Sequence, residues 1–376
     1  MRTTTCEGGV APLDDQHLPS VGYTRKQLVA LIRGSRITIP DLELLMSHWP
    51  HGVHPDIDKL EQDVQRSLES IFSSNRDNSR LQKMNATKVA LFGASWWAYA
   101  PLENLRIATQ LSIWLFVWDD ETDSSEFSAM VHDFAKASRF RAETVSYLRK
   151  SLARSSKGEA TEASTNPIIT CFGPVGAAIS KACNDRQVKR FLDELLYFVE
   201  MCEDEQKSQT TPHLPTIEEY MRRRMGSSAV RVCMAIMEYA SGITLSEQIL
   251  NDASMQVIWH ETNMIISTTN DILSIKKEIA QSQTDTLIPL LLTQLGSVQA
   301  AVNQAVEIVR LSIHRFEAAE QNILQRYSCA PDVQADIRRY VEGCKFACTA
   351  NLKWSLTSGR YKLNCTSLAG GLDITL

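Results

Sequence analysis

The chain has 376 residues, of which 44% are hydrophobic, and its formal net charge at pH 7 is −5. A chain of this length can bury a large core. Its slightly acidic balance gives no electrostatic reason to expect a nucleic acid or an anionic membrane surface as a partner. No stretch approaches the roughly 18 uncharged apolar residues of a membrane-spanning helix, so we expect no membrane span.

Residues 1–20 contain no apolar segment, so we expect no signal peptide and a cytoplasmic location. The nine cysteines are scattered and odd in number, which is typical of reduced thiols rather than of a disulfide framework. Cys344 and Cys348 are one helical turn apart, but no Cys/His pair elsewhere completes a zinc site.

Apolar residues at spacings of three and four predict helices along most of the chain. The predicted helices are Ile57–Phe72, Thr87–Tyr99, Leu102–Trp118, Glu126–Leu152, Gln187–Glu203, Ile217–Ala240, Ser246–Ala280, Val298–Arg326 and Val333–Leu356. Alternation of period two is nearly absent, so no sheet is expected. We predict an all-α helical bundle that forms a single domain over residues 21–365. Residues 1–20 are expected to be disordered and residues 366–376 to form a ragged tail.

Two polar, Ser/Thr-rich stretches that end in proline, residues 154–167 and 204–215, are predicted to be loops. The second loop leads into a helix start, because Thr216 and Glu219 have the spacing of a capping box. In a helical bundle, ligand sites form between helices from inward-pointing side chains. We therefore expect the active site in a central cavity.

The apolar run at 111–118 is followed at once by acidic residues, the first of which is Asp119. Asp119 and Asp123 are four residues apart and share one helical face. Buried carboxylates are costly unless they are paired or bind a metal. The alternative is a helix that leaves the core with its acidic end in water.

A second polar set interrupts the apolar helix predicted at 246–280. Asn270, Ser274 and Glu278 form a stripe along one face, and all three offer hard oxygen ligands that suit Mg²⁺. An exposed polar stripe is the simpler alternative, but the apolar residues before it favour burial. A di-iron site is excluded because the chain has no paired Glu-x-x-His motifs.

These residues carry a resemblance to a known family. The sequence DDETD at 119–123 matches the aspartate-rich motif of class I terpene synthases, and NDILSIKKE at 270–278 matches their second metal motif. Arg224 lies where the family places a diphosphate-sensing arginine, and Arg360 and Tyr361 resemble its C-terminal Arg-Tyr pair. The sequence resembles most a fungal sesquiterpene cyclase.

The resemblance implies a Mg²⁺-dependent sesquiterpene cyclase that ionises farnesyl diphosphate, releases diphosphate and cyclises the carbocation. Three Mg²⁺ ions are expected with diphosphate bound. The implied metal ligands are Asp119, Asp123, Asn270, Ser274 and Glu278. The implied diphosphate-binding residues are Arg224, Lys277, Arg360 and Tyr361. The implied catalytic residues are Arg224 and Phe116, the latter because its ring lies beside the metals in similar enzymes.

Several points stay open at the level of the sequence. The run Arg222–Arg224 leaves the register of the sensor arginine uncertain, although its spacing from Tyr220 favours Arg224. Asp120 is expected to pair with an arginine rather than to bind metal, and Asp271 to face away from the metals. Alternative functions are a diterpene cyclase, a prenyl-chain elongating transferase on the same fold, and a helical binding module without chemistry. Helical faces outside the bundle leave room for a homodimer.

One further expectation concerns closure. Like charges repel, so Arg224 and Arg360 are expected to converge only when an anion binds between them. Binding would then also order the loops at 154–167 and 204–215 and the segment beyond Cys365.

Overall fold

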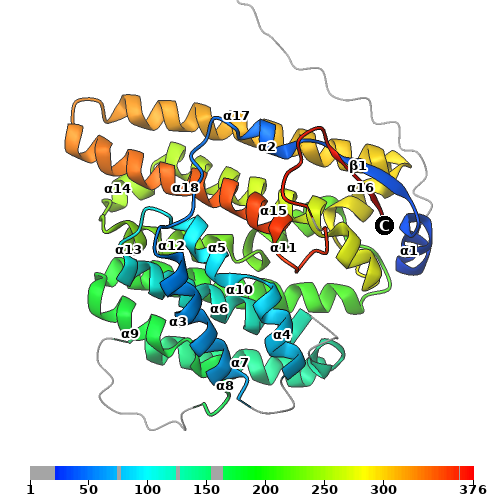
Figure 1. Ribbon diagram of the computed structural model, residues 1–376, viewed down its shortest axis with the longest axis horizontal. Helices are drawn as coiled ribbons and strands as arrows, with labels where there is room; N and C mark the ends of the chain where they lie inside the picture. Colours follow the sequence, from blue (N-terminus) through cyan, green and yellow to red (C-terminus); the bar gives the residue numbers. More distant parts are fainter. Residues whose placement is uncertain (1–21, 74–77, 124–127, 154–163, 364) are drawn as a thin grey trace, which may run out of the picture.

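A computed structural model describes residues 22–73, 78–123, 128–153, 164–363 and 365–376, with only the backbone at residue 123. The first helices are α1 (Arg25–Ile32), α2 (Leu42–Leu45), α3 (Ile57–Ile71), α4 (Asn78–Ala86), α5 (Val89–Trp96), α6 (Leu102–Asp123), the 3-10 helix η2 (Ala129–His132), α7 (Phe134–Ser151), α8 (Pro167–Thr170) and α9 (Gly173–Ala182). They are followed by α10 (Asp185–Thr210), α11 (Ile217–Ser227), α12 (Val230–Ala235), α13 (Met237–Ser241), α14 (Glu247–Leu250), α15 (Ala253–Ala280), α16 (Leu287–Leu295), α17 (Val298–Arg326) and α18 (Pro331–Thr357). The predicted all-α class is confirmed (Figure 1).

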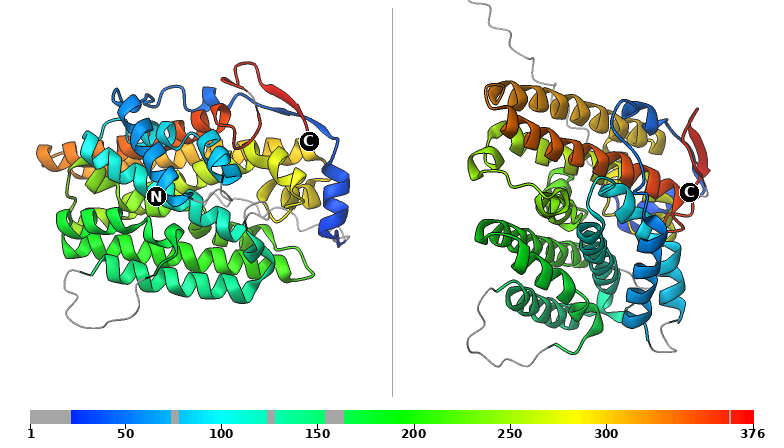
Figure 2. Two further views of the ribbon diagram at one scale, coloured as in Figure 1. Left: turned by 60° about the horizontal axis from the view of Figure 1, so that its bottom comes forward. Right: turned by 60° about the vertical axis from the view of Figure 1, so that its left-hand side comes forward.

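The long helices pack in two groups around a central space. On one side α15 packs against α17 and α18, and on the other α10 packs against α7, α11 and α12. Helices α5 and α6 join the groups, because α5 packs against both α6 and α18. Figure 2 shows the two groups of helices one above the other, with α17 and α18 in one and α7, α9 and α10 in the other. The core between them contains the fully buried side chains of Trp96, Trp97, Trp114, Trp118 and Trp354.

Most predicted helices are found, but several predictions of extent are wrong. Helix α6 continues past Trp118 to Asp123, the helix predicted at 246–280 is interrupted between α14 and α15, and α7 covers only Phe134–Ser151 of the helix predicted at 126–152. Helix α10 continues to Thr210, so residues 204–210 are helical rather than part of a loop. The physical reason is Gln206, which is buried and donates hydrogen bonds to the carbonyl oxygens of Met130 and Val131. The loop predicted at 154–167 lies mostly outside the described residues.

The helix predicted at 217–240 is broken into α11, α12 and α13. The first break is at Ala229, whose φ of 59° lies in the left-handed region, and α13 begins only after Ile236. The predicted capping box is confirmed: the Thr216 side chain accepts from the backbone of Glu219, and the Glu219 side chain accepts from the backbone of Thr216. It fixes the start of α11.

Gly226 allows α11 to lie close against α10. A Cβ atom at this position would lie 2.4 Å from Met201 Cγ and 2.8 Å from Tyr197 Cε1, both on α10. Real Cβ atoms do not approach other atoms so closely, so a larger residue would push the two helices apart. The close approach sets the position of Arg224, which lies on the same helix.

A two-stranded antiparallel sheet, which the sequence analysis did not expect, joins the two ends of the described chain. Strand β1 (Arg36–Ile39) pairs with β2 (Leu372–Thr375), with Arg36 opposite Thr375 and Ile39 opposite Leu372. The prediction of a ragged tail at 366–376 is therefore wrong. The strands are short, and only the alternate residues Ile37 and Ile39 of β1 are buried, so they give little periodic signal.

Over the residues described, none of the helices combines the length and the apolar character that crossing a lipid bilayer requires. The cysteines of the same residues are free thiols, in agreement with the expectation from their number and spacing.

Candidate active site

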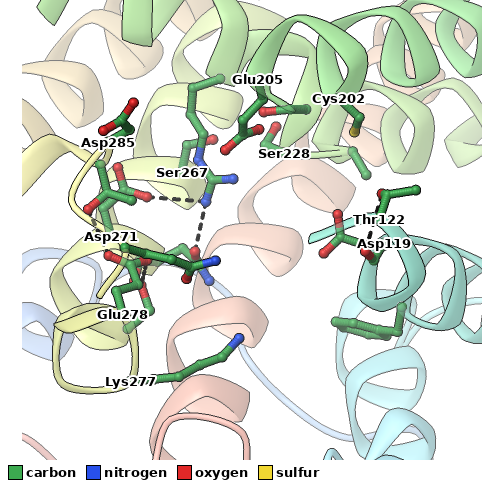
Figure 3. A pocket seen from close by; sticks show the side chains of 18 of the residues that line it. Asp119, Thr122, Cys202, Glu205, Ser228, Ser267, Asp271, Lys277, Glu278 and Asp285 are labelled. Atoms are coloured by element: carbon green, nitrogen blue, oxygen red, sulfur yellow. Dashed lines mark hydrogen bonds and ion pairs between the residues drawn. The ribbon is translucent and has the colours of Figure 1, made fainter. Parts of the chain in front are cut away.

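A cavity of about 580 Å³ lies between α6, α10, α11, α15 and α18. Its volume is in the range of small-molecule sites, roughly 300–1,000 Å³. Its wall contains the predicted site residues whose side chains are described: Phe116, Asp119, Arg224, Asn270, Ser274, Lys277, Glu278, Arg360 and Tyr361. Figure 3 shows Asp119 on one wall of the cavity and Asp271, Lys277 and Glu278 on the opposite wall.

In the acidic motif at the end of α6, one side chain lines the cavity and two others pair with arginines. Asp119 lines the cavity. Asp120 is buried and accepts hydrogen bonds from Arg360 at 3.0 and 3.3 Å, as expected for an acid that pairs with an arginine. Glu121 pairs with Arg80. The side chain of Asp123 lies outside the described residues, so its predicted place is not tested.

The second motif forms a connected polar stripe on α15. Ser274 Oγ lies 2.6 Å from Glu278 Oε1 and 2.7 Å from the backbone oxygen of Asn270. The other oxygen of Glu278 accepts a hydrogen bond from the hydroxyl of Thr286. Asp271 faces Tyr220 and Arg224, with the Tyr220 hydroxyl 2.5 Å from Oδ2.

Glu278 is the most informative member of this stripe. Its carboxylate is buried, and the hydrogen bonds at its two oxygens come from the neutral hydroxyls of Ser274 and Thr286. Burial, together with the nearby Asp271 carboxylate, raises the pKa of Glu278 to about 7. A divalent cation would supply the positive charge that this carboxylate needs. The hard oxygen donors of Asn270, Ser274 and Glu278 therefore fit a magnesium ion.

This raised pKa predicts a pH-dependent stability of the metal-free protein. The pKa of Glu278 is above its ordinary value of 4.5, so the protonated carboxyl stabilises the fold. This contribution is complete below pH 4.5 and is lost as the pH rises through about 7. In EDTA, the melting temperature of the wild type relative to Glu278→Gln should fall from pH 5 to pH 8 by roughly a few degrees.

The difference between the two proteins cancels the pH dependence that all other titratable groups contribute to both. Melting is followed by circular dichroism. Parallel pH curves for the two proteins would show that Glu278 titrates normally.

Three of the predicted diphosphate-binding residues reach the cavity from two parts of the chain: Arg224 lies on α11, and Arg360 and Tyr361 follow α18. Arg224 on α11 donates to Asn270 Oδ1 at 2.7 Å and pairs with Asp271 at 3.1 Å. Tyr361 is 2.7 Å from Asn270 Nδ2. Arg222 is exposed, so the structure places Arg224, and not Arg222, in the wall of the cavity.

The expectation that these two cations converge only around an anion stays a prediction. Arg224 and Arg360 both line the cavity because each is paired with a buried carboxylate, Asp271 and Asp120 respectively. Burial lowers the pKa of Arg360, but Asp120, Tyr361 and Asp119 together raise it by more, so the guanidinium stays charged. These pairs of opposite charge weaken the repulsion between the two arginines.

Aromatic side chains form the wall beside the acidic motif. Phe116 contacts Phe92 and Trp354, each with ring centroids 5.3 Å apart, and Phe92 stacks on Trp96 at 4.9 Å. Arg360 lies over the Phe116 ring with Cζ 5.2 Å from the centroid. Tyr99 shares a helical face with Phe92 in the sequence, but it packs against Phe346, away from the cavity wall.

Other lining residues were not found from the sequence. Trp354 carries no motif, and its place becomes visible only when α18 is packed against α5 and α6. Arg25 and Asp285 are 260 residues apart and form a bidentate ion pair, with 2.7 Å from Arg25 Nε to Oδ1 and 2.7 Å from Arg25 Nη2 to Oδ2. Arg25 also donates to the carbonyl oxygens of residues 208, 211 and 213. Such long-range pairs leave no signal in a single sequence.

Across the residues that the structure describes, no three acidic, His or Cys side chains come together as a metal cluster. The reason is visible in Figure 3: Asp119 and Glu278 lie on opposite walls. The remaining candidate ligands on α15, Asn270 and Ser274, are uncharged. The two motifs therefore face each other across a space and do not form one compact ion site.

The comparisons with known proteins identify the class. Residues 110–315, more than half of the chain, match the family described as terpene synthase family 2, C-terminal metal binding. The chain is a member of the terpene synthase family and contains its metal-binding domain. Sesquiterpene cyclase hepA of Aspergillus oryzae is 31% identical over 90% of this chain and 92% of its own length. Terpene cyclase braA of Annulohypoxylon truncatum is 24% identical over 96% of this chain and 92% of its own length.

Solved structures agree on the fold. Wild-type cucumene synthase superposes with a TM-score of 0.66 at 17% identity, over 82% of this chain and 99% of that one. Germacradien-4-ol synthase from Streptomyces citricolor superposes with a TM-score of 0.68 at 16% identity, over 82% of this chain and 96% of that one. The helical fold of this chain is that of the class I terpene synthases.

Proposed function

We propose that the protein is a sesquiterpene cyclase that takes farnesyl diphosphate, releases diphosphate and cyclises the resulting carbocation to a hydrocarbon or an alcohol. The observation that carries the proposal is a single cavity with two chemically different parts. One part contains Asp119, Glu278 and two arginines, and the other contains aromatic rings around Phe116. This arrangement suits a substrate with an anionic head and an apolar chain.

The proposed metal ligands are Asp119 and Asp123 on one side and Asn270, Ser274 and Glu278 on the other. Three Mg²⁺ ions bound there would neutralise the diphosphate and make it a better leaving group. In this chain, Asn270 is held by Arg224 and Tyr361, and Glu278 by Ser274 and Thr286. These hydrogen bonds orient the ligands before a substrate enters.

Arg224, Lys277, Arg360 and Tyr361 are proposed to hold the diphosphate. Arginine suits this role because its planar guanidinium donates two parallel hydrogen bonds to a phosphate. Arg224 and Arg360 are both placed in the wall by carboxylates on other helices, which keeps them directed at the cavity. Lys277 adds a third positive charge on the wall that carries Glu278.

The cation formed on ionisation needs a wall that stabilises charge and excludes water. Phe92, Trp96, Phe116 and Trp354 provide it, and each ring contributes about 0.5–2 kcal/mol of cation–π attraction. Phe116 is proposed as the catalytic ring because it lies one helical turn from the acidic motif.

The experiment that tests the function is an incubation of the purified protein with Mg²⁺ and the C10, C15 and C20 prenyl diphosphates, with and without isopentenyl diphosphate. We expect volatile cyclic C15 products from farnesyl diphosphate, with no requirement for isopentenyl diphosphate. Turnover of only the C20 substrate would identify a diterpene cyclase. Longer prenyl diphosphates would identify an elongating transferase, and no turnover would favour a binding module.

We further propose that residues 21–365 act as one catalytic domain in the cytoplasm. The helices that line the cavity come from the whole length of this segment, from α1 to α18, so no shorter part would contain the complete site. A homodimer is compatible with this proposal, since the cavity is built from one chain.

A further inference from the structure

The cavity wall contains a few buried polar atoms that have no hydrogen-bond partner. Among the described lining residues they belong to Trp96, Arg224, Ser227, Asp271, Thr284 and Asn351. A buried polar group without a partner costs free energy and calls for an explanation, such as a ligand or an ordered water. The question is which of these groups serves the chemistry of the apolar part of the cavity.

Arg224 and Asp271 belong to the diphosphate end, where they pair with each other. Ser227 is three residues from Arg224 on α11, and Thr284 is next to Asp285, which pairs with Arg25. The other two, Trp96 and Asn351, are in the aromatic part.

Asn351 lies on α18 three residues before Trp354, and both side chains line the cavity. Residues at this spacing are neighbours on one helical face. The Trp354 ring contacts Phe116 and Phe92, so Asn351 lies beside the rings proposed to surround the cation. Its side chain is buried, and its amide nitrogen has no partner among the described residues.

Asn351 differs from the other polar groups of this wall in what it offers. The Ser112 hydroxyl donates to the backbone oxygen of Ala108, and the Ser267 hydroxyl donates to Asn263. The Trp96 indole is a donor only, whereas an asparagine amide is both donor and acceptor. The unpartnered amide N–H of Asn351 can donate to one lone pair of a water oxygen, which leaves the other lone pair free to point away from the amide.

We propose that Asn351 holds a water molecule in the apolar part of the cavity and that this water ends the reaction, so that the main product is a sesquiterpene alcohol. This inference rests on the proposed function. A lone pair of the water oxygen forms a C–O bond to the final carbocation, and one O–H bond of the water breaks. The proton passes to the released diphosphate, which is the base that the first step produces. Asn351 is a positioning residue, since it neither gains nor loses a proton.

The experiment uses the full chain with Mg²⁺ and farnesyl diphosphate in water enriched in ¹⁸O. Diphosphate release and volatile products are measured together. We expect a cyclic C15 alcohol that carries one ¹⁸O atom. Asn351→Leu should lower the ratio of alcohol to hydrocarbon about tenfold, the factor that one hydrogen bond is worth, while diphosphate release stays within a few-fold of the wild type.

Three further variants make the result specific to the amide. Asn351→Ala removes the same group with less steric change, in case the leucine variant does not fold. Asn351→Ser keeps a donor and an acceptor and should retain more alcohol than either. Asn104→Leu removes an amide that bonds the backbone oxygen of Tyr239 outside the cavity wall, and it should leave the ratio unchanged.

Two outcomes separate this inference from the proposed function. Diphosphate release with only hydrocarbon products, or an unchanged ratio in Asn351→Leu and Asn351→Ala, would overturn the role of Asn351 and leave the cyclase proposal intact. No diphosphate release from farnesyl diphosphate would overturn the proposed function and this inference with it.

Discussion

Glu278→Gln is expected to keep the helical bundle folded and to lower kcat/KM for farnesyl diphosphate by about 100-fold or more. Glutamine has the same shape and can keep contacts with Ser274 and Thr286, but it removes the one charged ligand proposed on α15. Loss of a metal-ligand charge costs several kcal/mol of transition-state stabilisation. The Mg²⁺ concentration for half-maximal activity should rise, as measured by diphosphate release in a magnesium titration.

A matched control exists on the same helix. Glu261 is also buried on α15, but it pairs with Arg315 and does not line the cavity. Glu261→Gln should lower the melting temperature and leave the activity of the folded protein and its magnesium requirement unchanged. Full activity of Glu278→Gln at limiting Mg²⁺ would contradict the proposed metal site.

Arg224→Ala should reduce kcat/KM by roughly 100- to 1,000-fold, the cost of removing one preorganised donor to a developing anion. Arg224 lines the cavity and bonds both Asn270 and Asp271, so its loss also leaves the buried Asp271 carboxylate without its cation. The double change Arg224→Ala with Asp271→Asn relieves that second penalty. It should restore thermal stability and leave the activity low.

Arg222→Ala is the control for the choice between the neighbouring arginines. Arg222 is exposed, and removal of an exposed charge changes little. We expect its kcat/KM to stay within about twofold of the wild type. Greater sensitivity at Arg222 than at Arg224 would show that the chosen register is wrong.

The sequence predicted those parts of the cavity that a single helix carries. Asn270, Ser274 and Glu278 are on one face of α15, so their spacing alone places them together. The position of Asp119 follows in the same way, because it directly follows an apolar run in the last part of α6. Helix α17 was predicted to its exact ends, since its apolar period is unbroken from Val298 to Arg326.

The features that the sequence did not predict depend on contacts between distant segments. Gln206 keeps the polar end of α10 helical by bonding η2, and Ala229 breaks a helix in a conformation that alanine rarely adopts. Trp354 and Asn351 reach the cavity only through the packing of α18. The arginine pairs with Asp120 and Asp271 likewise depend on how separate helices meet.

The position of Arg360 over Phe116 links the two ends of the cavity. A cation on one face of a ring draws electron density from it, which weakens the attraction of that ring for a second cation. Because Arg360 is paired with Asp120 and lies over Phe116, it weakens the cation–π attraction that this ring can offer to a carbocation. Under the proposed function, the same side chain therefore contacts both the diphosphate and the ring that faces the carbocation.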